Sequence, residues 1–136
     1  MIITKETDYA LRLLRALRDG EKHTVSELSQ SEFVPQQFAY KILKKLSKSG
    51  MVQIIRGVDG GCQLIADLSK TSLYDVMEAV DENGSLCACM EPEYHCTWCA
   101  AHGNCSYHCR LAEIQQRLND ELRSCYIEEI LSNASR

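Results

Sequence analysis

The residues of this chain with the greatest potential for chemistry are its cysteines. Eight occur among 136 residues, and six of these lie between Cys87 and Cys109. Thiolates packed this densely repel one another unless they are protonated, oxidised or neutralised by a cation. In a secreted protein such a stretch would indicate structural disulfides, whereas in a protein of the cell interior it indicates metal or redox chemistry.

Spacing alone leaves the type of cysteine site open. Within the stretch, the pattern C-x2-C-x5-C-x3-C completes a group of six candidate ligands: Cys87, Cys89, Cys96, Cys99, Cys105 and Cys109. Three histidines lie among them as further candidates: His95, His102 and His108. An iron–sulphur cluster on three or four thiolates, a structural zinc site and a metal-free thiol–disulfide switch all suit these residues. Cys62 and Cys125, outside the group, are expected to be small core residues rather than ligands.

The elements around the cysteines are a loop and a long helix. Residues 87–109 contain Pro92 and Gly103 and have no sustained periodicity, which predicts a loop, and a loop of this length is either functional or disordered. A helix is expected from about Arg110 to Leu131. Its apolar residues recur near heptad spacing: Leu111, Ile114, Leu118, Leu122 and Cys125. Such a seam at the end of a small domain predicts pairing with its twin in a homodimer.

A second candidate site lies between Val34 and Leu64. Pro35 suits the start of a helix, Gly50 suits its end, and two short β-rich segments flank a glycine-rich turn. The expected buried face of this helix comprises Phe38, Ile42, Leu43 and Leu46. Its other face carries Gln36, Gln37, Tyr40, Lys41, Lys44, Lys45 and Lys48. The pattern predicts a winged helix-turn-helix, with a recognition helix followed by a β-hairpin wing at Met51–Arg56 and Cys62–Ile65.

The distribution of charge supports DNA binding by this part of the chain. Five basic residues and no acidic residue lie between Phe33 and Val58. Residues 1–56 contain ten Lys and Arg against six Asp and Glu, whereas residues 57–136 contain five against thirteen. Because cations gathered on one face neutralise phosphates, and glutamines reach base edges, we predict a double-stranded DNA partner despite the formal net charge of −4.

The remaining elements complete a mainly α fold with a small β-hairpin wing. A first helix is expected over Thr4–Asp19, with Glu6 and Asp8 in its first turn, where negative charge complements the helix dipole. Thr24 and Glu27 form a capping box that opens a second helix. A further helix is expected from Ser72 to near Asn83-Gly84. We therefore predict a winged helix-turn-helix domain (1–84), a cysteine-rich sensor loop (85–109), and a dimerisation helix with its tail (110–136).

Several functional classes do not fit the sequence. No apolar run approaches the length of a membrane span, and the N-terminus lacks the apolar core of a signal peptide, so a cytoplasmic protein without a membrane partner is expected. We find no nucleophile–base pair and no phosphate-binding loop, so no enzyme is expected. A distant alternative is a metal-storage or electron-carrying protein whose helix-turn-helix is vestigial.

The chain resembles a known group of bacterial regulators over nearly its whole length. The resemblance rests on T-K-E-T-D-Y-A-L-R at the start, the helix-turn-helix, G-M-V-Q-I-I-R-G-V-D-G-G at the wing, and the cysteine loop followed by a long helix. These features are similar to the IscR/NsrR/CymR/RirA group of winged-helix repressors. The resemblance implies a homodimer that binds a palindromic operator and senses iron, iron–sulphur, redox or nitric oxide status. It also implies a two-iron or four-iron cluster, with zinc or no metal as the alternative.

The resemblance assigns roles to the residues of the DNA-binding face. By position, Gln36, Gln37, Tyr40 and Lys41 fall where the group reads the major groove, and Arg56 falls where a wing arginine enters the minor groove. Lys44 joins this set through its place on the basic face of the helix. Tyr40 replaces an acidic base-reading residue of some members, so the operator cannot be transferred.

The resemblance also assigns roles at the cysteines. Cys109 aligns as the last ligand, because it precedes the long helix, and the first ligand falls near Cys89 or Cys87. The middle ligand stays open among Cys96, Cys99 and Cys105. Asp8 matches the position from which some members donate a carboxylate to the cluster of the partner subunit. The extra cysteines also allow an all-cysteine cage.

Overall fold

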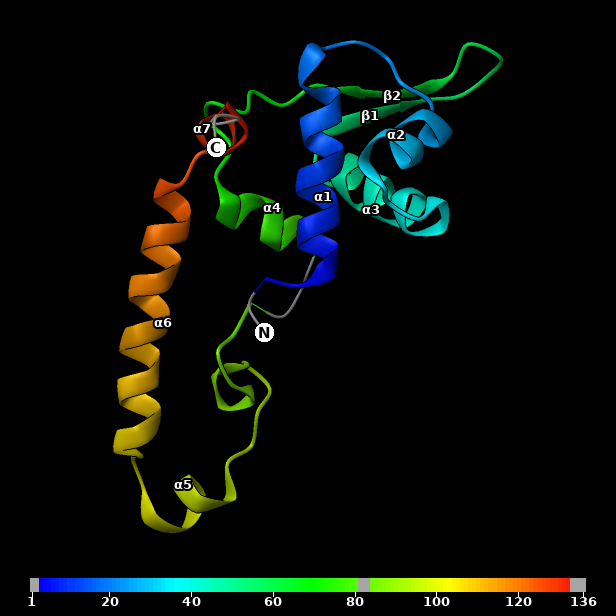
Figure 1. The fold of residues 1–136 in the computed structure, drawn as a ribbon. Coiled ribbons are helices and arrows are strands. Elements are labelled where there is room, and N and C mark those ends of the chain that lie inside the picture. The colour runs from blue at the N-terminus through cyan, green and yellow to red at the C-terminus, as the bar shows by residue number, and fades with distance from the viewer. Residues whose placement is uncertain (1–2, 81–83, 133–136) are drawn as a thin grey trace.

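The computed structural model describes residues 3–80 and 84–132, which form two unequal parts (Figure 1). We name them the head, which comprises residues 3–80 with the C-terminal helix, and the arm, which comprises residues 84–124. The head contains α1 (Lys5–Ala16), η1 (Leu17–Asp19), α2 (Val25–Glu32), α3 (Gln36–Lys48), β1 (Val52–Ile55), β2 (Gly61–Leu64), α4 (Leu73–Val80) and α7 (Ile127–Ser132). The arm contains η2 (Ala88–Met90), α5 (Thr97–His102) and α6 (Ser106–Ser124).

The hydrophobic core lies almost entirely in the head. α1 and α3 each bury one apolar stripe at helical spacing, and α4 and α7 close the core from the other side. The largest fully buried side chains are Leu13, Leu14, Leu17, Leu28, Val34, Ile42, Leu43, Leu46, Val52, Val76, Val80 and Ile127. This core holds the recognition helix and the wing in fixed positions.

The helix-turn-helix is present, with two local corrections. Thr24 and Glu27 form the predicted capping box at the start of α2, and Phe33 ends α2 in the left-handed region with φ of 55°. Pro35 is the N-cap of α3 rather than its first helical residue. The predicted burial of Phe38 is wrong, because it is 39% exposed against the Tyr9 ring and the core stripe of α3 starts at Ala39 instead.

The wing is an antiparallel hairpin of β1 and β2, in which Val52 faces Leu64 across the ladder. Gly57 has φ of 113° at the turn, a conformation that L side chains rarely adopt. A Cβ at Gly60 would clash with the carbonyl oxygen of Ile55. The glycines in R-G-V-D-G-G therefore permit a tight turn, and the winged helix-turn-helix prediction is confirmed.

Two helices of the head are shorter than predicted. The first helix is α-helical only to Ala16 and then tightens into the 3₁₀ turn η1, ended by Gly20 at φ of 75°. α4 begins at Leu73, after Ser72 and Asp75 have exchanged side-chain and backbone hydrogen bonds. Its predicted end near Asn83 lies outside the described residues.

The cysteine stretch contains more regular structure than the predicted loop. It includes η2 and α5, and α6 begins at Ser106 rather than near Arg110. The earlier start has a local cause, because the Cys105 sulfur accepts a hydrogen bond from the His108 backbone N–H at 3.4 Å and so caps the helix. Cys109 therefore lies in the first turns of α6.

The predicted long helix is two helices. α6 ends at Ser124, Cys125 turns into extended backbone, and α7 follows from Ile127. The break occurs because Cys125 and Ile127 bond to the segment before α4: Leu73 N–H donates to Cys125 O at 2.8 Å and Ile127 N–H to Thr71 O at 2.9 Å. Cys125 is half-buried at this junction.

No helix within residues 3–80 or 84–132 has both the length and the apolar character that a membrane span needs.

Candidate functional site

The predicted DNA-binding residues share one exposed surface formed by α3 and the wing. Gln36, Gln37, Tyr40, Lys41 and Lys44 are exposed on α3, and Arg56 is exposed where β1 enters the turn. A hollow of about 230 Å³ lies between the two elements, lined by Tyr40 on one side and by Ile54, Ile55 and Gly57 on the other. Helix and wing thus form a continuous face, as direct readout in one groove and a wing contact in the next require.

Two lysines of the recognition helix form ion pairs with one carboxylate of α1. Lys41 Nζ lies 2.7 Å from Glu6 Oε1, and Lys45 Nζ lies 2.7 Å from Glu6 Oε2. The two lysines lower the pKa of the Glu6 carboxyl below its ordinary value. Sequence reasoning assigned Glu6 only to the helix dipole, because nothing in its local sequence indicates a contact with α3.

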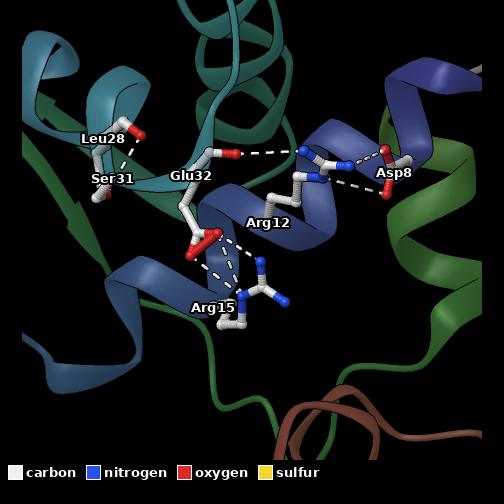
Figure 2. A network of polar contacts seen from close by, with 6 residues as sticks. All are labelled: Asp8, Arg12, Arg15, Leu28, Ser31 and Glu32. Atoms are coloured by element: carbon white, nitrogen blue, oxygen red, sulfur yellow. Dashed lines mark hydrogen bonds and ion pairs between the residues drawn. The ribbon is translucent and has the colours of Figure 1, made fainter.

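A polar network ties α1 to the turn of the helix-turn-helix (Figure 2). Arg12 bonds to the Asp8 carboxylate in the same helix, at 3.2 Å, and donates to the backbone carbonyl of Glu32 at 3.3 Å. Arg15 forms a second clamp on Glu32 through its carboxylate, at 2.6 Å. The end of α2, and with it the start of the turn into α3, is therefore fixed by two arginines of α1.

The cysteines of the arm gather around one hollow of about 430 Å³. Its lining comprises Cys89, Tyr94, Cys96, Trp98, Cys99, Cys105, Tyr107 and His108. Three separate elements contribute: η2 supplies Cys89, the turn of α5 supplies the C-x2-C pair, and the start of α6 supplies Cys105 and His108. We name these eight residues the cysteine hollow.

Three thiols of the hollow take part in sulfur–sulfur contacts: Cys96 and Cys99 contact each other, and Cys89 contacts Cys87, which does not line the hollow. The Cys87 and Cys89 sulfurs lie 3.1 Å apart, and this neighbour raises the pKa of the Cys89 thiol to about 11. Hydrogen bonds from the backbone N–H and the thiol of Cys99 lower the pKa of Cys96, while the same sulfur contact raises the pKa of Cys99. In each pair, the sulfur contact thus raises the pKa of one thiol, Cys89 or Cys99, and favours its protonated form.

His108 belongs to this cluster by contact. Its ring Nδ1 lies 3.3 Å from Cys89 Sγ, and its backbone N–H caps α6 through Cys105. His108 thereby connects the two cysteines that lie furthest apart in sequence within the hollow, Cys89 through its ring and Cys105 through its backbone. His95 and His102 are not among the lining residues, and His102 instead stacks on Trp98 with ring centroids 4.6 Å apart.

The donors in the hollow suit a soft, thiophilic metal. Four thiols and one imidazole are the ligand types used by iron–sulphur clusters and zinc, and the described part of the lining contains no carboxylate. Among the residues that the structure describes, no three His, Cys, Asp or Glu side chains converge closely enough to coordinate one ion. The donor set of the hollow fits such a group chemically.

The other predicted ligands lie apart from the hollow. Cys109 is exposed one turn beyond Cys105 on α6 and does not line it. Asp8 lies on α1 in the head, where Arg12 holds its carboxylate. The ligand roles of both residues stay predictions.

The hollow is connected to the head by the segment that precedes it. Gln115 on α6 accepts a hydrogen bond from the Leu86 N–H at 2.6 Å and donates to Gly84 O at 3.1 Å. Lys45 Nζ donates to Val80 O, the last residue of α4, at 2.9 Å. The two ends of the short segment between α4 and the cysteines are thus bonded to α6 and to the recognition helix.

Known proteins resemble this chain in sequence. The profile of the Rrf2 family, described as "Iron-dependent Transcriptional regulator", matches residues 3–133. Protein aau3 of Rhizobium meliloti is 33% identical over 93 residues, which cover 67% of this chain and 60% of aau3. The regulator NsrR of Geobacillus kaustophilus is 32% identical over 107 residues, which cover 76% of this chain and 67% of NsrR.

Solved structures resemble the chain in fold. CymR of B. subtilis, described as its global cysteine regulator, has a TM-score of 0.71 at 18% identity and covers 99% of both chains. IscR of T. potens has a TM-score of 0.70 at 12% identity, covering 99% of this chain and 89% of its own. At these identities the likeness concerns the fold alone. The sequence match over nearly the whole chain, on a confirmed winged helix-turn-helix, shows that the protein belongs to the Rrf2 family of transcriptional regulators and is not an enzyme.

Proposed function

We propose that this chain is a homodimeric, cytoplasmic repressor whose cysteine hollow holds an iron–sulphur cluster, two-iron or four-iron, that sets its affinity for a palindromic operator. One observation carries the proposal: four thiols and an imidazole from three elements of the arm line a single hollow. The relatives NsrR and IscR are transcriptional regulators of the same family. When bound, such a cluster would connect the cysteine sulfurs to one another through iron, and oxidation or nitric oxide would break that connection.

The chain's own residues supply the route from this hollow to DNA. Binding a thiophilic group requires the thiols to lose their protons. This loss breaks the hydrogen bonds within the Cys87–Cys89 and Cys96–Cys99 pairs. The elements that carry these residues then move together, and Gln115 passes that displacement to residues 84–86. Lys45, bonded to the end of α4, connects the same segment to the recognition helix. The result is a shift between two states of different operator affinity.

The apolar seam of α6 supports the homodimer. Leu111 and Leu118 are half-buried, Ile114 is 39% exposed, and only Leu122 is buried on the head. A stripe at heptad spacing that its own chain leaves open suits pairing with a second α6. Two heads related by a two-fold axis would present two recognition helices to the half-sites of a palindrome.

The first experiment is anaerobic purification with a visible spectrum and counts of iron, acid-labile sulphide and zinc per chain. We expect brown protein with both iron and sulphide. Trp98 is the single tryptophan of the chain and lines the hollow, so its fluorescence gives an independent signal of occupancy. The Cys105→Ser variant should lose both signals, while Cys125→Ala, outside the hollow, is the matched control that should keep them.

The same preparation separates the ligand sets. If Cys109→Ser retains iron and sulphide as Cys125→Ala does, Cys109 is not a ligand. If it loses them as Cys105→Ser does, the alignment-based assignment of Cys109 holds. The functional link fails if loaded and metal-free protein bind the operator equally at one stated salt concentration.

A second candidate function is a zinc-bearing or metal-free thiol switch, and the paired thiols favour it. The Cys87–Cys89 sulfurs at 3.1 Å and the oppositely shifted pKa values of Cys96 and Cys99 suit dithiol–disulfide chemistry. Colourless protein with stoichiometric zinc would make the hollow a zinc site. Colourless anaerobic protein without metal, whose DNA affinity changes on mild oxidation, would establish the switch.

A further inference from the structure

Among the acidic residues that the structure describes, Glu6 is the one that forms ion pairs with lysines of the recognition helix. Its two carboxylate oxygens each accept from a different lysine, Lys41 and Lys45, both at 2.7 Å. The lysines are one helical turn apart on α3, so a single carboxylate spans two successive turns of the helix that faces DNA. Lys45 is further fixed by the Val80 carbonyl oxygen at 2.9 Å. The contact joins α1, α3 and α4, which pack side by side in the head (Figure 1).

This contact matters for DNA because it uses the ammonium groups that phosphates would need. Lys41 retains a side-chain exposure of 54% and Lys45 of 36%, so both remain within reach of a polyanion. The Glu6 carboxylate nevertheless neutralises half of their charge, because two positive groups and one negative group leave a net charge of +1. A phosphate must therefore compete with Glu6 for each ammonium. Lys44, on the same helix, is exposed and is not a partner of Glu6.

We propose that Glu6 is a positioning residue that limits the DNA affinity of this regulator by holding Lys41 and Lys45 of the recognition helix in competition with DNA phosphates. The inference rests on the proposed DNA-binding function. In this arrangement Glu6 does not itself contact DNA. It sets the number of α3 lysines that are free to contact DNA phosphates. Its place in the first turn of α1 also means that a displacement of α1 relative to α3 changes the number of free cations.

The test measures the salt dependence of DNA binding for the wild type and Glu6→Gln. The probe is a duplex that the wild-type protein selects from a random-sequence pool, and affinity is measured between low and moderate salt. Each additional phosphate contact steepens the plot of log affinity against log salt by about 0.9. We therefore expect Glu6→Gln to steepen the slope by about 1 to 2 and to tighten binding at low salt by about three- to tenfold.

Three controls separate this effect from folding and from net charge. Glu129→Gln removes the same charge from α7, and it should leave the slope unchanged. Glu6→Asp keeps the carboxylate charge but is too short to reach both lysines, so it should free one of them and steepen the slope by about 1 at most. In a Lys41→Met, Lys45→Met background, Glu6→Gln should have no further effect on the slope, because the cations that it frees are missing.

The outcomes decide the two proposals separately. A wild-type slope for Glu6→Gln, in protein whose thermal unfolding shows it to be folded, overturns the role of Glu6 and leaves DNA binding intact. If Glu6→Gln does not fold, a wild-type slope in Glu6→Asp, whose shorter side chain cannot span both lysines, would overturn it equally. Wild-type protein that binds no duplex, with or without metal, overturns both this inference and the proposed function.

Discussion

The head and the arm of this protein are stabilised in different ways. In the head, twelve large side chains have less than 2% exposure, whereas Leu122 is the single buried residue of residues 84–124. Ion pairs follow the same division: Arg15–Glu32 and Arg18–Glu128 join separate helices of the head, whereas Arg110–Glu113 and Arg123–Asp120 lie within one helix of the arm. The head thus specifies its own structure through its packing, whereas the arm buries little of its own surface.

This difference suits a regulator. A rigid DNA-reading surface needs the packing that the head provides, because base contacts tolerate little displacement. A sensor needs states of similar free energy, and a region with few buried contacts has such states. If the division holds, a change in the head and a matched change in the arm should affect different properties of the protein.

The largest expected effect is on global stability. Leu46→Ala removes a fully buried side chain of α3, and we expect it to lower the free energy of unfolding by about 2–5 kcal/mol. Leu118→Ala on α6 should leave the unfolding of the head within about 1 kcal/mol of wild type and raise the dissociation constant of the dimer instead. Urea denaturation at two protein concentrations checks both. Equal losses from the two substitutions would contradict the division.

The next effect is on DNA affinity. Arg56→Ala removes the exposed wing cation, and binding should weaken by about 1–3 kcal/mol with a salt slope shallower by about 1. Arg117→Ala removes an exposed cation from α6 and should leave both quantities unchanged. Fluorescence anisotropy across a salt series measures the two together. A slope that falls for the arm variant would place DNA against α6 as well.

A smaller effect is expected at the helix caps. Thr24→Ala breaks the capping box of α2 and should lower the free energy of unfolding by about 1 kcal/mol. Cys105→Ala removes the sulfur cap of α6, and in metal-free protein it should cost less than Thr24→Ala, because a thiol is a weak acceptor. Thermal unfolding of both metal-free variants gives the comparison. A larger loss at Cys105 would show that the arm contributes to folding without its ligand.

The smallest effect is a pH dependence carried by Cys62. Its side chain is 1% exposed in the head, and burial raises its pKa above the ordinary value. The unfolded thiol therefore ionises first as pH rises, so stability falls above the ordinary thiol pKa, near pH 9. Cys62→Ala should reduce this alkaline loss by less than about 1 kcal/mol at pH 10. Chemical denaturation at pH 7 and pH 10 measures it, and identical losses in both proteins would contradict the assignment.

The sequence predicted the head well because its signals are local. Helical spacing, the Thr24–Glu27 capping box and the glycines of the wing act within a few residues, and the structure confirms all three. Phe38 is the exception. Its spacing was compatible with the buried face, but the exact rotation of α3 against α1 places Ala39 there instead, and that rotation is a tertiary property.

The arm and the contacts between elements were harder to predict. The extended backbone at Cys125, which separates α6 from α7, depends on hydrogen bonds to Thr71 and Leu73, far away in the sequence. The heptad spacing of the apolar residues includes Cys125 and therefore did not predict the break. Glu6 meets Lys41 and Lys45 only after the chain folds. The gathering of Cys89, Cys105 and His108 likewise joins η2 to α6, and no local pattern encodes that approach.

The docking of α7 has a consequence for how the covalent chain is held together. Ile127 is fully buried in the core, and Arg18 bonds to Glu128 and to the Leu131 carbonyl oxygen. The arm is therefore an excursion whose two ends both return to the same folded unit. A protease that nicks the exposed chain around Tyr94 produces two fragments, and we expect them to stay associated under native conditions and to part only in denaturant. The chain between α4 and α7 can thus be cleaved or lengthened, and the head should still retain α7.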